Sequence, residues 1–246
     1  NSSFYAIPPK KRVAAWADRT SECPNFFFSA KLNRVFTHEF CRDEALAAQY
    51  CDAFEPLRSA ERLRVVLAQF KYDFADTERA REHLEWLCDV FGAEFRLVLE
   101  LRHCSWERED AEAFLSRLQV GVAALDYPTA SNSFSVQNAG QGTPAYLRLH
   151  GRNRRAWFSK EASVNETYNY RYSADEIEQL AGRAREMHSR RGELIVVANN
   201  HYQGKAVAAA LRLKSALKKQ RVLCPPALVE TYPELQAVDS AGASAT

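Results

Sequence analysis

The stretch FRLVLELRHCSW, residues 95–106, decides the fold class. It begins as a nearly continuous apolar run and becomes polar at Glu100, Arg102 and His103. A short apolar run of this kind is typical of a strand that is buried on both faces of a parallel sheet. Polar side chains at its carboxyl end indicate the edge of the sheet where α/β proteins bind ligands.

Five more apolar runs share this pattern. They are residues 26–31, 65–70, 120–126, 145–151 and 194–200. Helical patterns alternate with the runs, at residues 9–20, 43–57, 76–91, 107–118, 173–191 and 205–218. Gly92 and Gly192 follow two of them and are expected to end their helices, and Ser173 opens a capping-box pattern. The alternation predicts an α/β protein of repeated strand–helix–strand units, with the layout of a β/α barrel.

The composition excludes several classes of protein. Apolar residues make up 46% of the 246 residues and charged residues 26%, and the net charge is only +2, so overall charge gives no reason to expect nucleic acid or a membrane surface as a partner. No apolar run approaches the roughly 20 residues that span a bilayer. The six cysteines are irregularly spaced, which favours reduced thiols in a cytoplasmic protein.

Polar residues close every one of the six runs, and these are the candidate site residues. In chain order they are Lys31, Gln69, Glu100, Arg102, Asp126, Arg148, His150, Asn199 and Asn200. A charge at such a place is costly to bury without a partner, and the carboxyl ends of parallel strands converge on the ligand crevice. The alternative is that strand ends are simply where exposure begins.

Glu100 and Arg102 lie two residues apart, on one face of their strand. They form either a structural ion pair or an acid–base group whose pKa is set by its neighbours. His103 adds a titratable ring, and Trp106 adds a stacking surface. His38 follows the first strand and is either a surface histidine or a third imidazole of the same site.

Three histidines with Glu and Asp can bind a metal, but no local metal motif is present, so the sequence allows a metal without requiring one. His83 and His188 fall within helical patterns, where we expect solvated side chains.

The segment 151–172 interleaves basic and aromatic residues. It holds Arg152, Arg154, Arg155, Trp157, Lys160, Tyr168, Tyr170 and Tyr172. Such a segment can grip phosphates and stack bases, which would make nucleic acid a partner. The alternative is a solvated lid.

The motifs, taken in order, resemble the YecE-like family, a bacterial and archaeal family catalogued as domain of unknown function seventy-two. The resemblance rests on NSSFY (1–5), FSAK (28–31), THE (37–39), LAQF (67–70), LELRHCSW (99–106), YLRLHG (146–151), YRYS (170–173) and NN (199–200). It implies a TIM-like β/α barrel with a polar pocket at the strand carboxyl ends, and it adds Asn1 and Tyr5 to the substrate-binding candidates. The family has no firmly assigned reaction.

This sequence differs from the family pattern at several positions. Leu32 follows Lys31 where a proline is usual, Cys104 also replaces a proline, and His201 stands where an acidic residue is common. The family's first strand and most of its second lie upstream of NSSFY. We therefore predict a natural protein that is longer, with residues 1–235 as one N-terminally incomplete barrel domain and 236–246 as a flexible tail.

Three functional hypotheses follow. The leading one is an enzyme, with hydrolase-type activity as one option, that acts on a small anionic or phosphorylated substrate. Glu100 would be its acid or base, with His38, His103 and His150 as proton carriers, while Lys31, Arg102 and Arg148 hold the anion. Gln69, Asn199 and Asn200 would orient the substrate. The second hypothesis is a protein that binds nucleic acid or processes phosphodiesters through 151–172. The third is a non-catalytic binding module.

Overall fold

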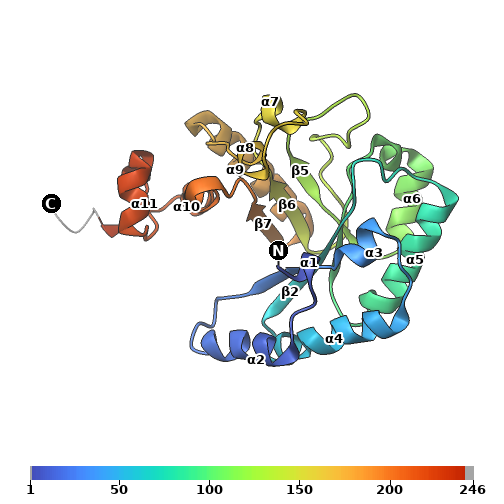
Figure 1. Cartoon of the computed structure of the whole chain (residues 1–246). Coiled ribbons are helices and arrows are strands. Elements are labelled where there is room, and N and C mark those ends of the chain that lie inside the picture. The colour runs from blue at the N-terminus through green and yellow to red at the C-terminus, as the bar shows by residue number, and fades with distance from the viewer. Residues whose placement is uncertain (1, 242–246) are drawn as a thin grey trace. The chain divides into compact units, whose positions relative to one another are not determined.

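Within residues 2–241, seven parallel strands carry the apolar runs, and they form two sheets (Figure 1). The first sheet has four strands in the order β1-β2-β3-β4, and each neighbouring pair is parallel. The strand bounds are β1 Phe28–Lys31, β2 Leu63–Gln69, β3 Leu97–Glu100 and β4 Gly121–Val122. The prediction of strands at residues 26–31, 65–70 and 95–102 is therefore confirmed, with boundaries that differ by up to two residues.

The second sheet has three strands in the order β5-β6-β7, again all parallel. Their bounds are β5 Ala124–Asp126, β6 Ala145–Leu149 and β7 Leu194–Ala198. The expected single strand at residues 120–126 is divided at Ala123. The backbone N–H of Ala123 still bonds to Leu99 of β3, whereas Asp126 accepts from His150 at the end of β6. One apolar run thus supplies strands to two sheets.

The structure is a computed structural model that describes residues 2–241, and these divide into two compact units. Unit 1 holds residues 2–123 and 131–134, and unit 2 holds residues 124–130 and 135–241. The mixed α/β class with parallel sheets is confirmed. No closed barrel is found among the described residues, so the TIM-like barrel and the single barrel domain stay predictions.

All six helical patterns form helices. They are α2 Lys10–Arg19, α4 Glu44–Ser59, α5 Glu78–Gly92, α6 Glu109–Arg117, α9 Ala174–Arg191 and α10 Lys205–Lys218. The capping box at Ser173 is confirmed, and Gly192 ends α9 in the left-handed conformation that glycine tolerates. α5 ends at Gly92 as expected, but Gly92 is its last helical residue and not a left-handed glycine beyond its end, and Ala93 follows it in right-handed helical conformation.

Short helical turns complete the elements. They are α1 Ser2–Tyr5, α3 Arg34–His38, η1 Cys104–Glu107, α7 Arg154–Trp157, α8 Val164–Thr167, η2 Tyr202–Gly204, α11 Pro226–Thr231 and η3 Pro233–Ala237. No helix within residues 2–241 is both long and apolar enough to cross a bilayer.

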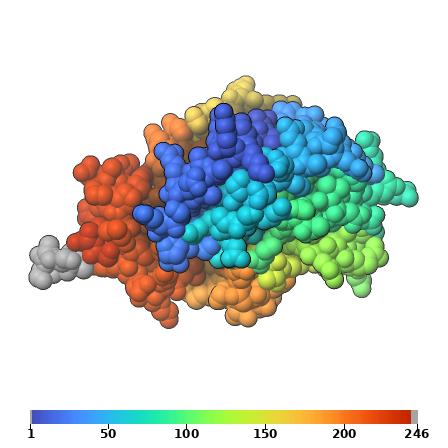
Figure 2. Space-filling view, turned by 90° about the horizontal axis from the view of Figure 1, so that it is seen from below, coloured from blue at the N-terminus to red at the C-terminus, as the bar shows by residue number. Residues whose placement is uncertain are grey.

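The core of unit 1 is rich in aromatic side chains. Phe70, Phe74 and Trp106 stack in sequence, with ring centroids 4.1 and 5.5 Å apart. On the surface shown in Figure 2, the N-terminal residues in blue lie against the light-blue residues that follow them, in line with the contact between α2 and α4. The expectation that His83 is solvated is wrong. Its ring is 1% exposed, and its Nε2 lies 2.6 Å from the carbonyl oxygen of Phe36.

Burial in the sheets follows strand position. All residues of the central strand β6 are buried, whereas all five residues of β7 are only half-buried. Among the described residues β7 pairs with β6 alone, and this edge position is why its apolar run falls short of the expected two-sided burial. In the predicted tail, Asp239 accepts a hydrogen bond from the backbone N–H of Cys224. The rest of that tail, 242–246, lies outside the described residues.

Candidate functional site

Lys31, at the carboxyl end of β1, is fixed by its own backbone and by two aromatic neighbours. Its carbonyl oxygen accepts from Ser3 Oγ at 2.8 Å and from the Tyr50 hydroxyl at 2.9 Å. Its ammonium donates to Gln69 Oε1 at 2.9 Å and lies 4.3 Å from the centre of the Phe4 ring. A cation is therefore held at this strand end by an amide oxygen and an aromatic face.

Glu100 closes β3 beside Gln69. The two residues are register partners in the parallel β2–β3 pair, so their side chains leave the sheet on the same face. Glu100 is fully buried, and its Oε1 accepts from Arg102 Nε at 2.9 Å and from Nη2 at 2.6 Å. The ion pair between Glu100 and Arg102 is therefore present, and a role as an acid–base group stays a prediction.

His38 ends α3 and faces the same group of cations. Its Nδ1 lies 3.0 Å from Thr37 Oγ1, and its ring meets Phe4 edge to face at 5.0 Å. Burial lowers the pKa of His38 to about 4, and the positive charges of Lys71, Lys31, Arg34 and Arg102 lower it further in the same direction. His38 is therefore neutral at pH 7. We call Lys31, His38, Gln69, Glu100 and Arg102 the lysine–glutamate cluster of unit 1.

The remaining unit 1 candidates have other positions. His103 caps η1, because its Nδ1 lies 2.8 Å from Ser105 Oγ and accepts from the Ser105 backbone N–H. Trp106 is fully buried and donates from its indole nitrogen to Phe74 at 2.7 Å. It has no exposed face on which a ligand could stack, so the predicted stacking role finds no support. Tyr5 is 72% exposed, and Asn1 lies outside the described residues.

In unit 2, Arg148, Asn199 and His150 form a buried chain of hydrogen bonds. Arg148 Nη2 donates to Asn199 Oδ1 at 3.0 Å, and Asn199 Nδ2 lies 3.1 Å from His150 Nδ1. A guanidinium can only donate, so the Asn199 amide must present its oxygen to Arg148 and its nitrogen to His150. Nδ1 of His150 is then an acceptor, and the neutral ring carries its proton on Nε2.

Aromatic rings surround His150. Its ring centre lies 5.7 Å from Trp157, 6.1 Å from Tyr168 and 6.2 Å from Tyr127. His201 lies against Tyr168 at 5.1 Å. Trp157 and Tyr168 belong to the segment 151–172 and are half-buried, so two of its aromatic residues pack around His150. We call these rings the histidine cage.

Asp126 ends β5 in a network of its own. Arg152 Nη2 donates to it at 2.7 Å, and the Tyr172 hydroxyl donates to it at 2.7 Å. Arg152 also pairs with Glu176 at 3.0 Å. Burial, followed by the negative charge of Asp126, raises the pKa of Tyr172 well above its ordinary value. Asp126 was predicted to bind substrate. Its carboxylate oxygens instead accept hydrogen bonds from Arg152 and Tyr172 of the protein itself.

The basic side chains of 151–172 are largely engaged within the protein. Arg152 forms an ion pair with Asp126, Arg154 donates to the Thr129 carbonyl at 2.7 Å, and Arg171 forms an ion pair with Glu234. Asn200 is fully buried and donates to the carbonyl of Tyr170 at 2.9 Å. Nucleic acid as a partner stays a prediction.

Several contributors were missed at the sequence level. Ser3, Phe4 and Tyr50 hold Lys31. Glu176 pairs with Arg152 beside Asp126, and Arg152 was named only as a basic residue of the segment 151–172. Ser3 and Phe4 sit inside the segment NSSFY, of which only Asn1 and Tyr5 were named as candidates, so position in that motif was an available signal. No sequence signal pointed to Tyr50. Across residues 2–241, no group of three His, Cys, Asp or Glu side chains is placed to hold a metal ion.

Comparison with known proteins settles the family. The pattern of the family described as "Protein of unknown function DUF72" matches residues 1–233. The chain belongs to the DUF72 family. The resemblance inferred from the motifs is thereby confirmed.

Relatives of the DUF72 family support this assignment. The UPF0759 protein YunF of Bacillus subtilis (strain 168) is 25% identical over 221 residues, which are 84% of this chain and 77% of YunF. A DUF72 family crystal structure from Thermotoga maritima MSB8 matches with a TM-score of 0.76 at 30% identity, over 87% of this chain and 82% of that one. Another, from Enterococcus faecalis V583, has a TM-score of 0.78 at 25% identity, over 88% and 82%.

Proposed function

We propose that the lysine–glutamate cluster is the catalytic site of an enzyme that acts on a small anionic or phosphorylated substrate. The observation that carries the proposal is the setting of His38. Burial lowers the pKa of His38, and the positive charges of Lys71, Lys31, Arg34 and Arg102 act on the ring in the same direction. A group of cations beside a neutral imidazole attracts an anion and leaves a ring able to exchange a proton.

Lys31 and Arg102 would hold the anionic group. Lys31 presents an ammonium that is already oriented by Gln69 and Phe4, and Arg102 is oriented by the buried Glu100. Fixed donors of this kind stabilise negative charge more than mobile surface lysines do, because they need no reorganisation when charge develops.

Glu100 would act as the general base, and neutral His38 would donate a hydrogen bond or relay a proton. Glu100 can take a proton from a water or hydroxyl nucleophile, while the neighbouring cations offset the charge that develops on the substrate. The reaction class would be hydrolysis: as the water oxygen bonds to phosphorus, the bond from phosphorus to the leaving oxygen breaks, and the proton accepted by Glu100 is returned to the leaving group or to solvent.

The test uses inorganic phosphate for binding and p-nitrophenyl phosphate for turnover. Isothermal titration should show that phosphate binds the unmodified protein and binds Lys31→Gln at least tenfold more weakly, because one charge-assisted contact is worth about 1.5–3 kcal/mol. Glu100→Gln should keep phosphate binding and lose turnover.

Glu112→Gln is the matched control for the carboxylate. It makes the same chemical change at an exposed position of α6 and should leave both phosphate binding and turnover of p-nitrophenyl phosphate unchanged. Turnover that survives in a folded Glu100→Gln protein would remove Glu100 from the mechanism. Phosphate binding that is indifferent to Lys31→Gln would refute the assignment of the site.

A further inference from the structure

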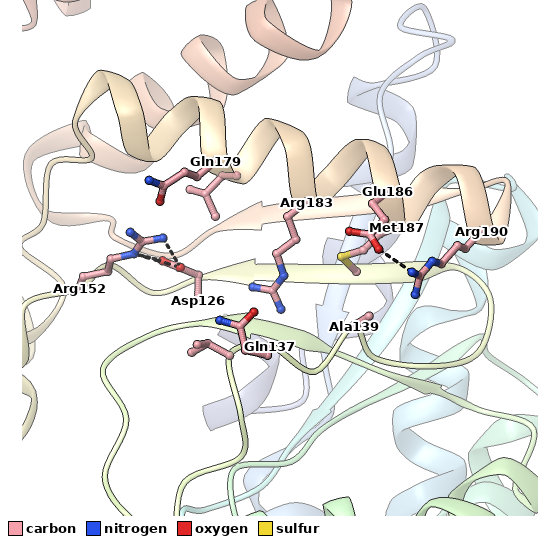
Figure 3. Close-up of a pocket in the computed structure, with 11 residues that line it drawn as sticks. Asp126, Gln137, Ala139, Arg152, Gln179, Arg183, Glu186, Met187 and Arg190 are labelled. Atoms are coloured by element: carbon pink, nitrogen blue, oxygen red, sulfur yellow. Dashed lines mark hydrogen bonds and ion pairs between the residues drawn. The ribbon is translucent and has the colours of Figure 1, made fainter.

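A pocket of about 600 Å³ lies in unit 2, between α9 and the chain that follows β5 (Figure 3). The pocket lies where the connection between two parallel strands has no helix. Residues 127–144 join the parallel strands β5 and β6, and none of these described residues is helical. Parallel strands are usually joined through a helix that covers the sheet. Here an irregular segment makes the connection, and the side of α9 that faces it stays open.

Two arginines of α9 fix the wall of this pocket. Arg183 donates from Nη1 to the Leu125 carbonyl and from Nη2 to the Asn138 carbonyl, each at 2.9 Å. Arg191 donates to the carbonyls of Gly140 and Gly142 at 3.1 and 3.3 Å. The irregular segment is therefore tied to the helix, and the pocket is formed before any ligand arrives.

Of the three arginines that line the pocket, two form ion pairs with carboxylates and one does not. Arg152 is paired with Asp126, and Arg190 with Glu186 at 2.5 Å. Arg183 has no carboxylate partner among the described residues, and its contacts are two carbonyl oxygens. Burial lowers the pKa of Arg183, the positive charge of Arg152 acts in the same direction, and the negative charge of Asp126 opposes them without forming an ion pair with Arg183.

Arg183 still has hydrogen-bond capacity. A guanidinium has five N–H donors, and the two carbonyls use two of them. Figure 3 shows its side chain extending from α9 into the pocket, and Gln137, the residue before Asn138, lines the same pocket. A partly buried cation with spare donors, at the wall of a formed pocket, is the arrangement that recognises an oxyanion.

We propose that this pocket binds a small molecule through one oxyanion, a carboxylate or a phosphate, held by Arg183. Gln137 and Gln179 would bond to neighbouring polar groups of the ligand, and Leu180 and Met187 form an apolar wall. The volume is within the range of about 300–1,000 Å³ that is typical of small-molecule sites. The proposal concerns unit 2 alone and is independent of the lysine–glutamate cluster.

The chain supplies its own reporter for a test. Met187 lines the pocket and is the one methionine of the sequence, so methyl-¹³C-methionine labelling gives a single NMR signal from this site. The protein is titrated with inorganic phosphate and, separately, with acetate at constant ionic strength. A saturable shift of the Met187 signal with either anion is expected, and the tighter of the two identifies phosphate or carboxylate as the recognised group.

Three variants separate the site from general effects. Arg183→Gln should weaken anion binding at least tenfold, whereas Arg185→Gln, the same change at an exposed position two residues away on α9, should leave it unchanged. Gln137→Glu adds a carboxylate to the lining of the pocket that Arg183 shares, next to its partner Asn138, and should abolish the anion-dependent shift while the protein stays folded. If Arg183→Gln fails to fold, the Gln137→Glu variant still tests whether the pocket binds the anion.

The outcomes decide the proposal without reference to the catalytic hypothesis. Lys31→Gln lies in unit 1 and should leave the Met187 titration intact. No saturable shift with either anion would overturn the pocket as an anion site. A shift that persists in Gln137→Glu would overturn the role of Arg183.

Discussion

Replacing Gly151 with alanine should destabilise the protein through two separate effects. Gly151 follows His150 of the histidine cage and has a φ of +87°, a conformation that costs an L-residue about 1–2 kcal/mol. An added Cβ would also lie 2.6 Å from Cβ of Tyr170 and 3.5 Å from Cβ of Asn200. Relieving such a clash in a packed region costs about 1–3 kcal/mol. The two together give a loss of about 2–5 kcal/mol in the free energy of unfolding.

The assay is urea unfolding followed by circular dichroism, with Gly192→Ala as the matched control. Gly192 has a similar φ of +75°, but an added Cβ there would meet nothing within 4 Å. The control should therefore lose only the backbone contribution of about 1–2 kcal/mol. If Gly151→Ala costs no more than Gly192→Ala, the close approach of Tyr170 to Gly151 is not a real constraint and the reasoning is refuted.

Three further predictions rest on the same contacts. Trp106→Ala should lower the free energy of unfolding by about 3–5 kcal/mol in urea titrations but leave phosphate affinity unchanged, because the ring is core and not ligand surface. The pKa of His38 is about 4 when folded and ordinary when unfolded, so the unfolded chain binds the extra proton between these values. Stability should therefore be complete above about pH 6.5 and fall toward pH 4, by about 1–2 kcal/mol after allowance for solvent screening, and His38→Gln should flatten this part of the urea-derived profile. Asp126→Asn should cost about 2–4 kcal/mol in thermal unfolding, because Arg152 and Tyr172 lose a buried carboxylate; a change below 1 kcal/mol would contradict that network.

The regular elements were predictable because local pattern and tertiary environment agree. The central strands β2, β3 and β6 have neighbours on both sides, so their apolar runs are buried as periodicity predicts. β7 has an equally apolar sequence, but its edge position leaves it half-buried. The division at Ala123 was invisible in the sequence, since both parts of the run are apolar and only pairing with β3 or β6 tells them apart.

The position of the candidate site was predictable from the sequence, but the hydrogen-bond and ion-pair partners of its side chains were less so. Polar residues at strand ends gave the lysine–glutamate cluster, because register brings Gln69 beside Glu100. Side-chain partners depend on tertiary contacts that no local pattern encodes. His83 is buried against Phe36 despite its helical setting, and Asp126 is occupied by Arg152 from beyond the next strand.

The division of the chain between the units has a consequence for dissecting the protein by expression. Residues 131–134 belong to unit 1, although the chain on either side of them belongs to unit 2. Phe134 is buried in the unit 1 core, and its backbone N–H bonds to the carbonyl of Arg102. A fragment that stops at Ala123 would therefore lack a segment that braces Arg102, and no single cut yields both units whole. The clean way to separate them is a circular permutation or a graft that returns residues 131–134 to the first fragment.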